Sequence, residues 1–596
     1  MIEDSVEEAS VPALPPPPPI DELGGVRADV VFENDLNEEH KRIIEGRGHL
    51  AEQIKAQVAS SIPIPRTHEQ AMRSEYAEQW REAELAEFKQ MEKMKVWKQV
   101  RLEDVPKGSK IMGCSQRYKV KPTADGLVSK FKYRFCADGR GQVLGVDFKE
   151  SYAPVIEPTY YRWLVAIATQ LDWDLIEFDF SGAFLNSDLP VLKRKRYMRP
   201  PPGLPLTHPN NVLDLLKGIY GNPDAARLWF DNVSGKWKEL SWKQNPAEKC
   251  LFAKTYDSGK KLAIMILHVD DGGAGAKEIE VIEHDLRKMK QFYGLDSQPM
   301  QWHLGTRVTR KKGKWSAIQI DSYIMELAKR TGMLDCKKQL TPADHNVVLT
   351  KEYENKADKA KYMQMVGCLI YAATAARPDV AKAVATLAKF LRDPGRIHMN
   401  AAKRVIAYLL HSKQKGLVFK KEDLGEHDNE FDHIAAMLHH GYWDADFATC
   451  KDTRRSVSGI LLFFGNGLIF WKCKGQSIVA LSSFESETIA GSLITRAALA
   501  QRQVIKGILN NVKPTVLRGD NQPCLQSIRS GNYSSQRSKH IDLRFKHMTE
   551  VSNKEDCVYV KVDTKDNLAD MLTKNQVPAI FKGMVDKLVF NPANMQ

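Results

Sequence analysis

Apolar residues first recur at helical spacing just after residue 66. Met72, Tyr76 and Trp80 lie four residues apart, which indicates one face of a helix. Thr67 and Gln70 have the spacing of a capping box, in which a hydroxyl and a carboxamide satisfy backbone N–H groups at a helix start. We therefore predict that ordered structure begins at residue 67.

Short apolar runs typical of strands alternate with helical stretches between residues 96 and 345. These runs are residues 116–120, 130–136, 175–180 and 262–269. Residues 355–412 are predicted to be mostly helical, and the polar stretch 420–433 to be a linker.

The last third of the chain contains a predicted hairpin, in which Gly465-Asn466-Gly467 joins apolar runs at 456–464 and 468–471. At the other end, five consecutive prolines at 15–19 favour an extended chain. The pattern divides the protein into four predicted parts. They are a disordered, acidic, Pro-rich tail (1–66), a large mixed domain (67–345), a helical connector with a linker (346–435) and a smaller α/β domain (436–596).

Composition excludes several classes of protein. A chain of 596 residues with 43% hydrophobic and 27% charged residues is typical of globular domains. It has no apolar run of the length that spans a bilayer and no basic leader before an apolar core, so we expect neither a membrane protein nor a secreted one. The nine cysteines are scattered and never form a Cys-x-x-Cys pair, which argues against a disulfide framework and a zinc knuckle.

The net charge of +13 is distributed unevenly. Residues 1–50 hold 12 acidic and 4 basic side chains, so the remainder of the chain is strongly basic. A chain region this basic suggests a polyanionic partner, and nucleic acid is the commonest polyanion that proteins bind. A basic surface that is merely solvated is the alternative.

Two predicted strands of the large domain carry carboxylates. Asp179 lies in the apolar run 175–180, and Asp270 and Asp271 directly follow the run 262–269. A divalent cation would relieve the repulsion between adjacent aspartates, and two carboxylate-bearing strands side by side suit a two-metal phosphoryl-transfer site. A solvated Asp-Asp pair in a hairpin turn is the alternative.

A second set of acids lies in the last domain. Its members, each on a different predicted element, are Asp444, Glu487, Asp520 and Asp570. Their number and spread suggest a metal site of the two-ion hydrolytic type. Alternatively, Glu485 or Glu487 simply occupies the first turn of a helix, where the helix dipole favours an acid.

Ordered motifs across the large domain and the helical connector resemble the reverse transcriptases of Ty1/copia-type retrotransposons. They are Trp80-Arg81-Glu82-Ala83, Lys132-Tyr133-Arg134, Tyr152-Ala153-Pro154-Val155, Phe178-Asp179, Ala183-Phe184-Leu185-Asn186, Tyr220-Gly221, Arg227-Leu228-Trp229, His268-Val269-Asp270-Asp271 and Arg377-Pro378-Asp379. The resemblance implies that Asp179, Asp270 and Asp271 are the polymerase carboxylates, with Asp179 and Asp270 as metal ligands. It also implies that Lys132 and Arg134 face the triphosphate of the incoming nucleotide.

The last domain resembles the ribonuclease H domain that follows these polymerases. The matching pieces are Arg454-Arg455-Ser456, Ser458-Gly459, Ser482-Ser483, Glu485, Glu487, Asp520-Asn521, Lys539-His540-Ile541-Asp542 and residues 569–574. The resemblance implies that Asp444, Glu487, Asp520 and Asp570 are catalytic and bind two Mg²⁺ ions. His540 either assists near the scissile phosphate or is a surface histidine.

The expected fold is therefore α+β and multidomain. Residues 67–345 would form the fingers and palm of a right-hand polymerase, 346–435 a helical thumb or connection, and 436–596 a ribonuclease-H-like α/β domain. The implied activity is RNA-directed DNA polymerisation together with ribonuclease H cleavage, with two Mg²⁺ per active site. Implied partners are an RNA template, a DNA primer, an RNA–DNA hybrid and deoxynucleoside triphosphates, and the implied localisation is cytoplasmic and nuclear.

Several positions depart from the family pattern. His268 replaces a tyrosine, and residues 272–276 are a glycine-rich stretch that predicts a loose hairpin. Asp224 lies where the family carries polar residues near the nucleotide, and an acid there would repel a triphosphate. Two alternatives therefore stay open: a catalytically decayed nucleic-acid-binding remnant or scaffold, and a chain active only as ribonuclease H.

Overall fold

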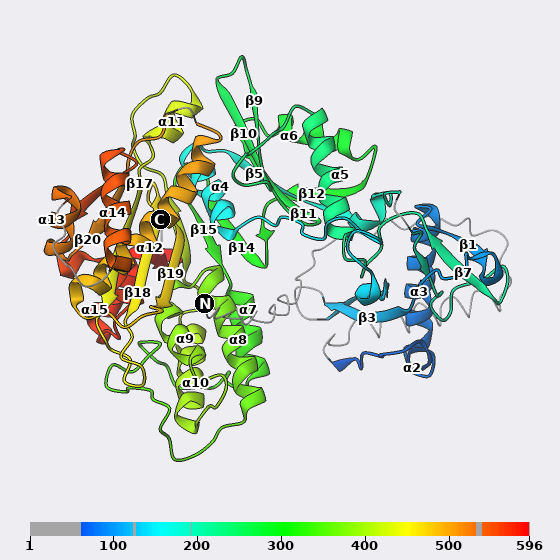
Figure 1. The fold of residues 1–596 in the computed structure, drawn as a ribbon, viewed down its shortest axis with the longest axis horizontal. Coiled ribbons are helices and arrows are strands. Elements are labelled where there is room, and N and C mark those ends of the chain that lie inside the picture. Colours follow the sequence, from blue (N-terminus) through cyan, green and yellow to red (C-terminus); the bar gives the residue numbers. More distant parts are fainter. Residues whose placement is uncertain (1–60, 123–126, 192–193, 510, 532–538, 595–596) are drawn as a thin grey trace.

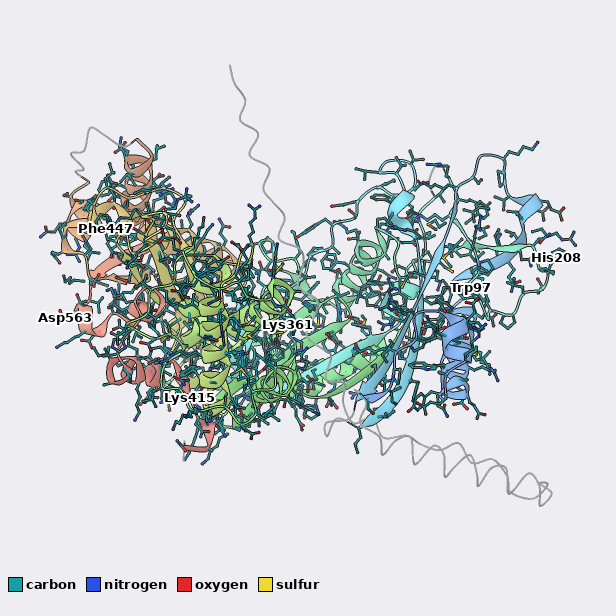
Figure 2. The ribbon with its side chains drawn as sticks, turned by 90° about the horizontal axis from the view of Figure 1, so that it is seen from below. Trp97, His208, Lys361, Lys415, Phe447 and Asp563 are labelled. Atoms are coloured by element: carbon teal, nitrogen blue, oxygen red, sulfur yellow. The ribbon has the colours of Figure 1, made fainter. Side chains whose placement is uncertain are left out.

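We describe the protein from a computed structural model that covers residues 61–122, 127–191, 194–509, 511–531 and 539–594 (Figure 1). Except for residues 61–66, the predicted tail lies outside the described residues. Seen from below, the fingers with Trp97 and His208 lie at one end and the last domain with Phe447 and Asp563 at the other (Figure 2). None of the described helices is long and apolar enough to cross a bilayer.

The fingers combine two helices, a hairpin and a small sheet of order β1-β7-β6-β2. Their bounds are α2 (His68–Met72), α3 (Ala77–Lys93), β1 (Trp97–Arg101), β2 (Ile111–Met112), the hairpin β3 (Cys114–Pro122) and β4 (Val128–Ala137), β6 (Tyr197–Met198) and β7 (Asn211–Leu215). Thr67 caps α2 as predicted, although that helix ends after five residues and α3 continues the apolar face. Trp80, Phe88 and Phe135 form the centre of a separate fingers core.

The palm is a six-stranded sheet of order β12-β5-β11-β10-β9-β8. Its strands are β5 (Asp174–Ser181), β8 (Lys243–Gln244), β9 (Leu251–Tyr256), β10 (Lys261–His268), β11 (Asp271–Ala276) and β12 (Gly294–Pro299), and its helices are α4 (Pro158–Gln170), α5 (Ala225–Glu239) and α6 (Glu280–Met289). The two runs predicted as carboxylate-bearing strands are thus β5 and β10. Only β11 separates them, so both sets of aspartates reach one region of the sheet.

A third sheet, of order β13-β14-β15-β16-β22, joins distant parts of the sequence. Its strands are β13 (Trp302–His303), β14 (Thr306–Lys311), β15 (Trp315–Gln319), β16 (Gly416–Lys420) and β22 (Val589–Phe590), accompanied by α7 (Asp321–Arg330), α8 (Lys359–Ala375), α9 (Ala381–Ala388), α10 (Arg396–His411), α11 (Glu430–Ala436) and α15 (Pro578–Leu588). The mostly helical stretch 355–412 is confirmed as α8, α9 and α10. This sheet takes strands from three of the four predicted parts, so the structure does not separate at residues 345 and 435.

The last domain is a mixed sheet of order β19-β18-β17-β20-β21. Its elements are β17 (His439–Asp446), β18 (Val457–Phe464), β19 (Gly467–Gly475), β20 (Thr515–Gly519), β21 (Cys557–Lys561), α12 (Ser483–Lys506), α13 (Gln522–Ser530) and α14 (Lys539–Asn553). The predicted hairpin is β18–β19, paired antiparallel, whereas β17, β20 and β21 run parallel. Helix α12 packs across β17 and β18, which places its first turns over the central strand.

The last domain is docked on the palm through α4. The Arg162 guanidinium donates to the carbonyls of Ile469 (3.1 Å), Ala375 (2.9 Å) and Thr374, and it lies 4.0 Å from the ring centre of Trp471. One apolar core runs without a break from the palm through the connection into this domain. The palm and the last domain therefore share a common interior.

Candidate active sites

The first carboxylate cluster lies on three adjacent strands of the palm. Asp179 on β5 is directly opposite Asp271 on β11 and, on its other side, directly opposite Asp296 on β12. Directly opposed residues project from the same face of a sheet, so the three carboxylates lie in one row on the exposed face. Like charges in such a row destabilise a sheet unless a cation lies between them.

Asp270 is held in a strained turn between β10 and β11. The preceding residue, Val269, has a φ of 60°, a left-handed conformation that is rare for a β-branched side chain. Trp229 on α5 donates to the Val269 carbonyl (2.6 Å), and the Phe180 N–H donates to the Asp270 carbonyl (2.9 Å). These two hydrogen bonds hold the turn that places Asp270 beside Asp271.

The expected loose hairpin is wrong, because β11 is fully paired on both sides. It is aligned with β10 and with β5 over all six of its residues, and five of those residues are buried. A Cβ on Gly272 would lie 2.1 Å from the ring of Phe178, and a Cβ on Gly275 would lie 2.8 Å from the side chain of Leu175. Glycine is therefore what allows these side chains of β5 to pack against the strand.

The expected repulsion between Asp224 and a triphosphate is also wrong. Asp224 is buried just before α5, and it accepts two hydrogen bonds from Arg196, at 2.8 and 2.6 Å. Arg196 is equally buried, so the pair is closed off from solvent. The negative charge of Asp224 is compensated inside the protein.

The predicted triphosphate contacts, Lys132 and Arg134, lie on β4 of the fingers hairpin. Their partners across the hairpin are Lys119 and Arg117, so the basic side chains gather on one face. The Arg134 guanidinium lies 4.8 Å from the ring centre of Tyr220. Burial raises the pKa of Tyr220, Arg134 opposes this, and Glu87 and Asp270 add to it, so that the pKa is about 12. The tyrosine thus packs directly against the basic face.

His268, which replaces the family's tyrosine, lies directly opposite Asp271 across the hairpin. Burial lowers its pKa, although Asp270 acts in the opposite direction. The imidazole is therefore neutral near pH 7, and it brings no positive charge to the aspartates.

The second cluster brings together three of the four predicted acids. Carboxylate oxygens of Asp444 on β17, Glu487 on α12 and Asp520 after β20 all lie within 4.8 Å of one another. Glu485, in contrast, accepts a hydrogen bond from the backbone N–H of Leu481 (2.7 Å) and so satisfies the start of α12. Of the two glutamates weighed from the sequence, Glu485 therefore has the capping role and Glu487 points to the other acids.

Asp570, the fourth acid, forms an ion pair with Lys574, a residue that the sequence did not point to. Lys574 Nζ lies 2.8 Å from Asp570 Oδ1 and 3.5 Å from Asp444 Oδ1. Burial opposes the charged form of Lys574, yet the two aspartates raise its pKa. Asp570 lies in a short helical turn, Leu568–Leu572, and Lys574 follows that turn; the i,i+4 spacing of the two residues was the available signal.

The charge of the second cluster is incompletely compensated. Burial raises the pKa of Asp444 to about 6 and the neighbouring Asp570 adds to the effect, while burial and Asp444 raise the pKa of Glu487 well above its usual range. Glu487 Oε2 is buried and has no hydrogen-bond partner among the described residues. A divalent cation fits here, because hard cations bind carboxylate oxygens and would satisfy the orphaned atom.

The structure does not distinguish the two roles considered for His540, which are assistance near the scissile phosphate and a simple surface position. It lies at the start of α14, and its side chain is outside the described part of the structure.

A fingers–palm unit with a row of aspartates, followed by a domain with a buried carboxylate cluster, defines the class of the reverse transcriptases with ribonuclease H. Residues 94–345 match the family described as reverse transcriptase (RNA-dependent DNA polymerase). Over 80% or more of its length the chain is similar to the Pol polyproteins of Ty1/copia-type retrotransposons. The fold class predicted from the sequence is confirmed.

Among its relatives is the retrovirus-related Pol polyprotein from transposon TNT 1-94 of Nicotiana tabacum, 30% identical over 80% of this chain and 35% of the relative. The Pol polyprotein from transposon RE1 of Arabidopsis thaliana is 28% identical over 88% of this chain and 34% of the relative. The chain thus spans about a third of the length of these relatives. A foamy viral protease–reverse transcriptase in complex with double-stranded DNA is similar over 89% of this chain and 80% of that one, with 10% identity and a TM-score of 0.45.

Proposed function

We propose that the chain is an RNA-directed DNA polymerase that also cleaves the RNA strand of RNA–DNA hybrids. The observation that carries the polymerase is the placement of Asp179 directly opposite Asp271, with Asp270 held beside them in a strained turn. Two Mg²⁺ ions bound there would activate the primer 3′-hydroxyl and stabilise the leaving pyrophosphate. Asp179 and Asp270 are the proposed ligands and Asp271 the supporting carboxylate.

The residues around this site have proposed roles that follow from their positions. Lys132 and Arg134 supply cationic donors for the phosphates of the incoming nucleotide, since paired cations suit phosphate oxygens. Tyr220 packs against Arg134 and holds its guanidinium in place on the basic face. Template RNA and primer DNA are held by their phosphates on the basic body of the protein.

The ribonuclease H reaction is assigned to the second cluster. Asp444, Glu487, Asp520 and Asp570 are the proposed ligands of two Mg²⁺ ions, and the unsatisfied Glu487 Oε2 is the observation that supports a cation there. The two main arguments for a catalytically decayed remnant no longer hold. The charge of Asp224 is neutralised by Arg196, and the glycines of β11 are required by packing.

Primer extension tests the polymerase. Oligo(dT) on poly(rA) with Mg²⁺ should be extended by the wild type and not by an Asp270→Asn, Asp271→Asn double variant. Asp257→Asn, an exposed acid in the β9–β10 turn of the same sheet, is the matched control and should extend normally. No extension by folded wild-type protein that binds the hybrid would refute the polymerase.

Cleavage of an end-labelled RNA in a hybrid tests the second activity separately. Glu487→Gln should abolish cleavage and leave primer extension intact. Glu485→Gln should retain cleavage, because that side chain serves the helix start. Equal cleavage by wild type and Glu487→Gln would remove the assignment.

A further inference from the structure

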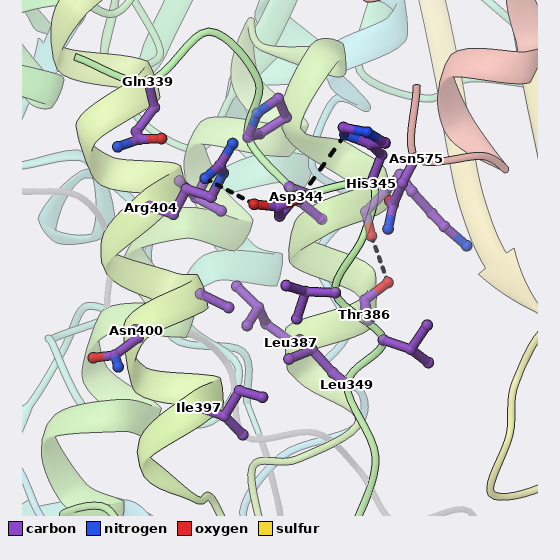
Figure 3. Close-up of a pocket in the computed structure, with 18 of the residues that line it drawn as sticks. Gln339, Asp344, His345, Leu349, Thr386, Leu387, Ile397, Asn400, Arg404 and Asn575 are labelled. Atoms are coloured by element: carbon purple, nitrogen blue, oxygen red, sulfur yellow. Dashed lines mark hydrogen bonds and ion pairs between the residues drawn. The ribbon is translucent and has the colours of Figure 1, made fainter. Parts of the chain in front are cut away.

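A cleft of about 750 Å³ lies between helices α9 and α10 of the connection and the last domain (Figure 3). The segment between α7 and α8 and two loops of the last domain, residues 446–451 and 573–575, complete its walls. Figure 3 shows Leu349, Leu387 and Ile397 around its apolar part. A cleft of this volume is large enough for a ligand with several groups of side-chain size.

The apolar part of the cleft is partly open to water. Val348 is 50% exposed, and Val347 and Ile397, which also line the cleft, are 39% and 41% exposed. Leu387 and Phe390 of the wall are buried. Exposed apolar side chains that gather at a groove mark a surface that an apolar partner covers.

The rim of the cleft carries positive charge that lacks a partner. Lys382 and Arg404 form ion pairs, with Asp446 (3.2 Å) and Asp344 (3.5 Å) respectively. Four further lysines line the cleft, are exposed and form no ion pair within the described ranges of the chain: Lys337, Lys389, Lys403 and Lys451. A sugar–phosphate backbone would match the lysines alone, whereas an acidic peptide with apolar side chains matches both the lysines and the apolar wall.

Residues 29–39 of this chain have that composition. The segment lies outside the described part of the structure, and its sequence is Asp29-Val30-Val31-Phe32-Glu33-Asn34-Asp35-Leu36-Asn37-Glu38-Glu39. It holds five acidic residues, four apolar ones and no base, and Phe32 is the only aromatic residue in positions 1–60. Its acids are numerous enough to compensate all four unpaired lysines of the cleft.

The chain is long enough to bring this segment to the cleft. Glu39 lies 22 positions before Ser61, where the described structure begins. An extended chain of that length spans about 75 Å, or about three times the radius of gyration of about 25 Å expected for a compact body of this size. Tethered segments face their sites at effective concentrations of about 1 mM, so a contact with a Kd of about 0.1 mM is about nine-tenths occupied.

We propose that residues 29–39 bind in this cleft of the same chain. Phe32 packs on the apolar wall, and the acids pair with Lys389 and Lys451. Lys389 directly follows α9, whereas Lys451 belongs to the last domain, so the bound segment contacts both regions.

The bound segment restrains the second carboxylate cluster. Thr573 and Lys574 form part of the cleft wall, and Lys574 contacts both Asp444 and Asp570. Acids held beside this cluster repel the phosphates of a polyanionic substrate, and salt screens the repulsion. This consequence rests on the proposed ribonuclease H function, whereas the docking itself does not.

Zero-length carbodiimide crosslinking of the full chain tests the docking, because it joins a carboxylate to an amine only where the two are in contact. Mass spectrometry should find the acids of residues 29–39 joined to Lys389 and Lys451 at least tenfold more often than to Lys288 and Lys290, two exposed lysines at the end of α6. Equal frequencies at the two pairs overturn the proposal. In a mixture of ordinary and ¹⁵N-labelled chains, links between the two isotopic forms would assign the cleft to the tail of a second copy and overturn docking within one chain.

The apolar contribution has its own test. Phe32→Ser keeps every charge and should lower the crosslinks to Lys389 and Lys451 at least fivefold, because the ring no longer covers the apolar wall. Leu14→Ser, in the same tail but outside the segment, is the matched control and should leave the crosslinks unchanged. Loss in both variants, or in neither, contradicts docking of this segment.

Hybrid cleavage by the full chain tests the restraint. The tested variant neutralises four acids of the segment: Glu33→Gln, Asp35→Asn, Glu38→Gln and Glu39→Gln. Its kcat/KM should exceed that of the wild type about tenfold at 50 mM KCl and less than about twofold at 300 mM, because salt screens the contact. The matched control makes the same change in net charge earlier in the tail: Glu3→Gln, Asp4→Asn, Glu7→Gln and Glu8→Gln. The control should cleave like the wild type, and an equal rise in both variants would overturn the restraint.

The two readouts separate this inference from the function on which its consequence rests. Specific crosslinks with no cleavage by any variant would leave the docking standing and refute the proposed nuclease. Cleavage without specific crosslinks would refute the docking and leave the nuclease standing.

Discussion

Replacing Asp224 by asparagine should destabilise the palm at α5. The substitution keeps the shape of the side chain but leaves the Arg196 guanidinium, which is 3% exposed, without its charge partner. Removing one member of a buried ion pair costs about 3–5 kcal/mol. Local opening of α5 should therefore become about 100- to 4,000-fold more frequent, since each 1.4 kcal/mol is a factor of ten.

Hydrogen–deuterium exchange of peptides covering α5 measures this opening without assuming that the whole chain unfolds in one step. Asp231→Asn is the matched control, because Asp231 lies on the same helix in an exposed ion pair with Arg227 (2.8 Å). Exposed pairs contribute about 0–1 kcal/mol, so exchange should change by less than about fivefold.

A second variant tests the cause of the effect. Arg196→Met combined with Asp224→Leu removes both charges, and replacing a buried pair by apolar side chains is often neutral. Exchange should return toward the wild-type rate. The reasoning fails if Asp224→Asn exchanges within threefold of the wild type. It also fails if that variant lowers the KM for the incoming nucleotide, as relief of a repulsion would.

Three further changes test other parts of the structure. Gly272→Val should cost about 1–3 kcal/mol by overpacking against Phe178, and thermal unfolding and primer extension should both show the loss. Burial lowers the pKa of His439 to about 4, so the unfolded chain takes up a proton first as the pH falls below 6.5. The last domain should lose about 3 kcal/mol between pH 6.5 and 4, and urea titrations of His439→Gln should show a flatter pH dependence. Arg162→Met leaves the buried carbonyl of Ile469 unpaired at about 1–3 kcal/mol, removes two part-buried hydrogen bonds to α8 and removes the contact with Trp471, so limited proteolysis should detect release of the last domain from the palm.

The elements of both sites were predictable where apolar periodicity is strong. The strands that carry Asp179 and precede Asp270 were predicted from short, mostly apolar runs. Strand β17 and helix α12 bring Asp444 and Glu487 together, as the four separated acids suggested. The catalytic roles of these residues stay predictions. What the sequence shows well is local: which residues form an element and which acids it carries.

The pairing of strands and side chains that lie far apart in the sequence could not be predicted from it. Asp296 joins the row because β12 pairs with β5, and that register depends on a sheet assembled from strands more than a hundred residues apart. Asp224 was misread because its partner Arg196 lies on a different segment. The same holds for Gly272, since the side chain that requires a glycine there belongs to β5.

The third sheet has a consequence for how the protein is made. Strand β16 is synthesised before the last domain, whereas β22, which pairs with it, and α15 are synthesised after that domain. The ion pair of Lys415 with Asp586 joins residues 171 positions apart. At 5–20 residues per second, the ribosome needs about 10–35 s to deliver the missing edge. During that time the Tyr408 face of α10, which later packs on Phe581, stays open to water. A chaperone that shields this face would act in that interval, after the palm has emerged and before the sheet is closed.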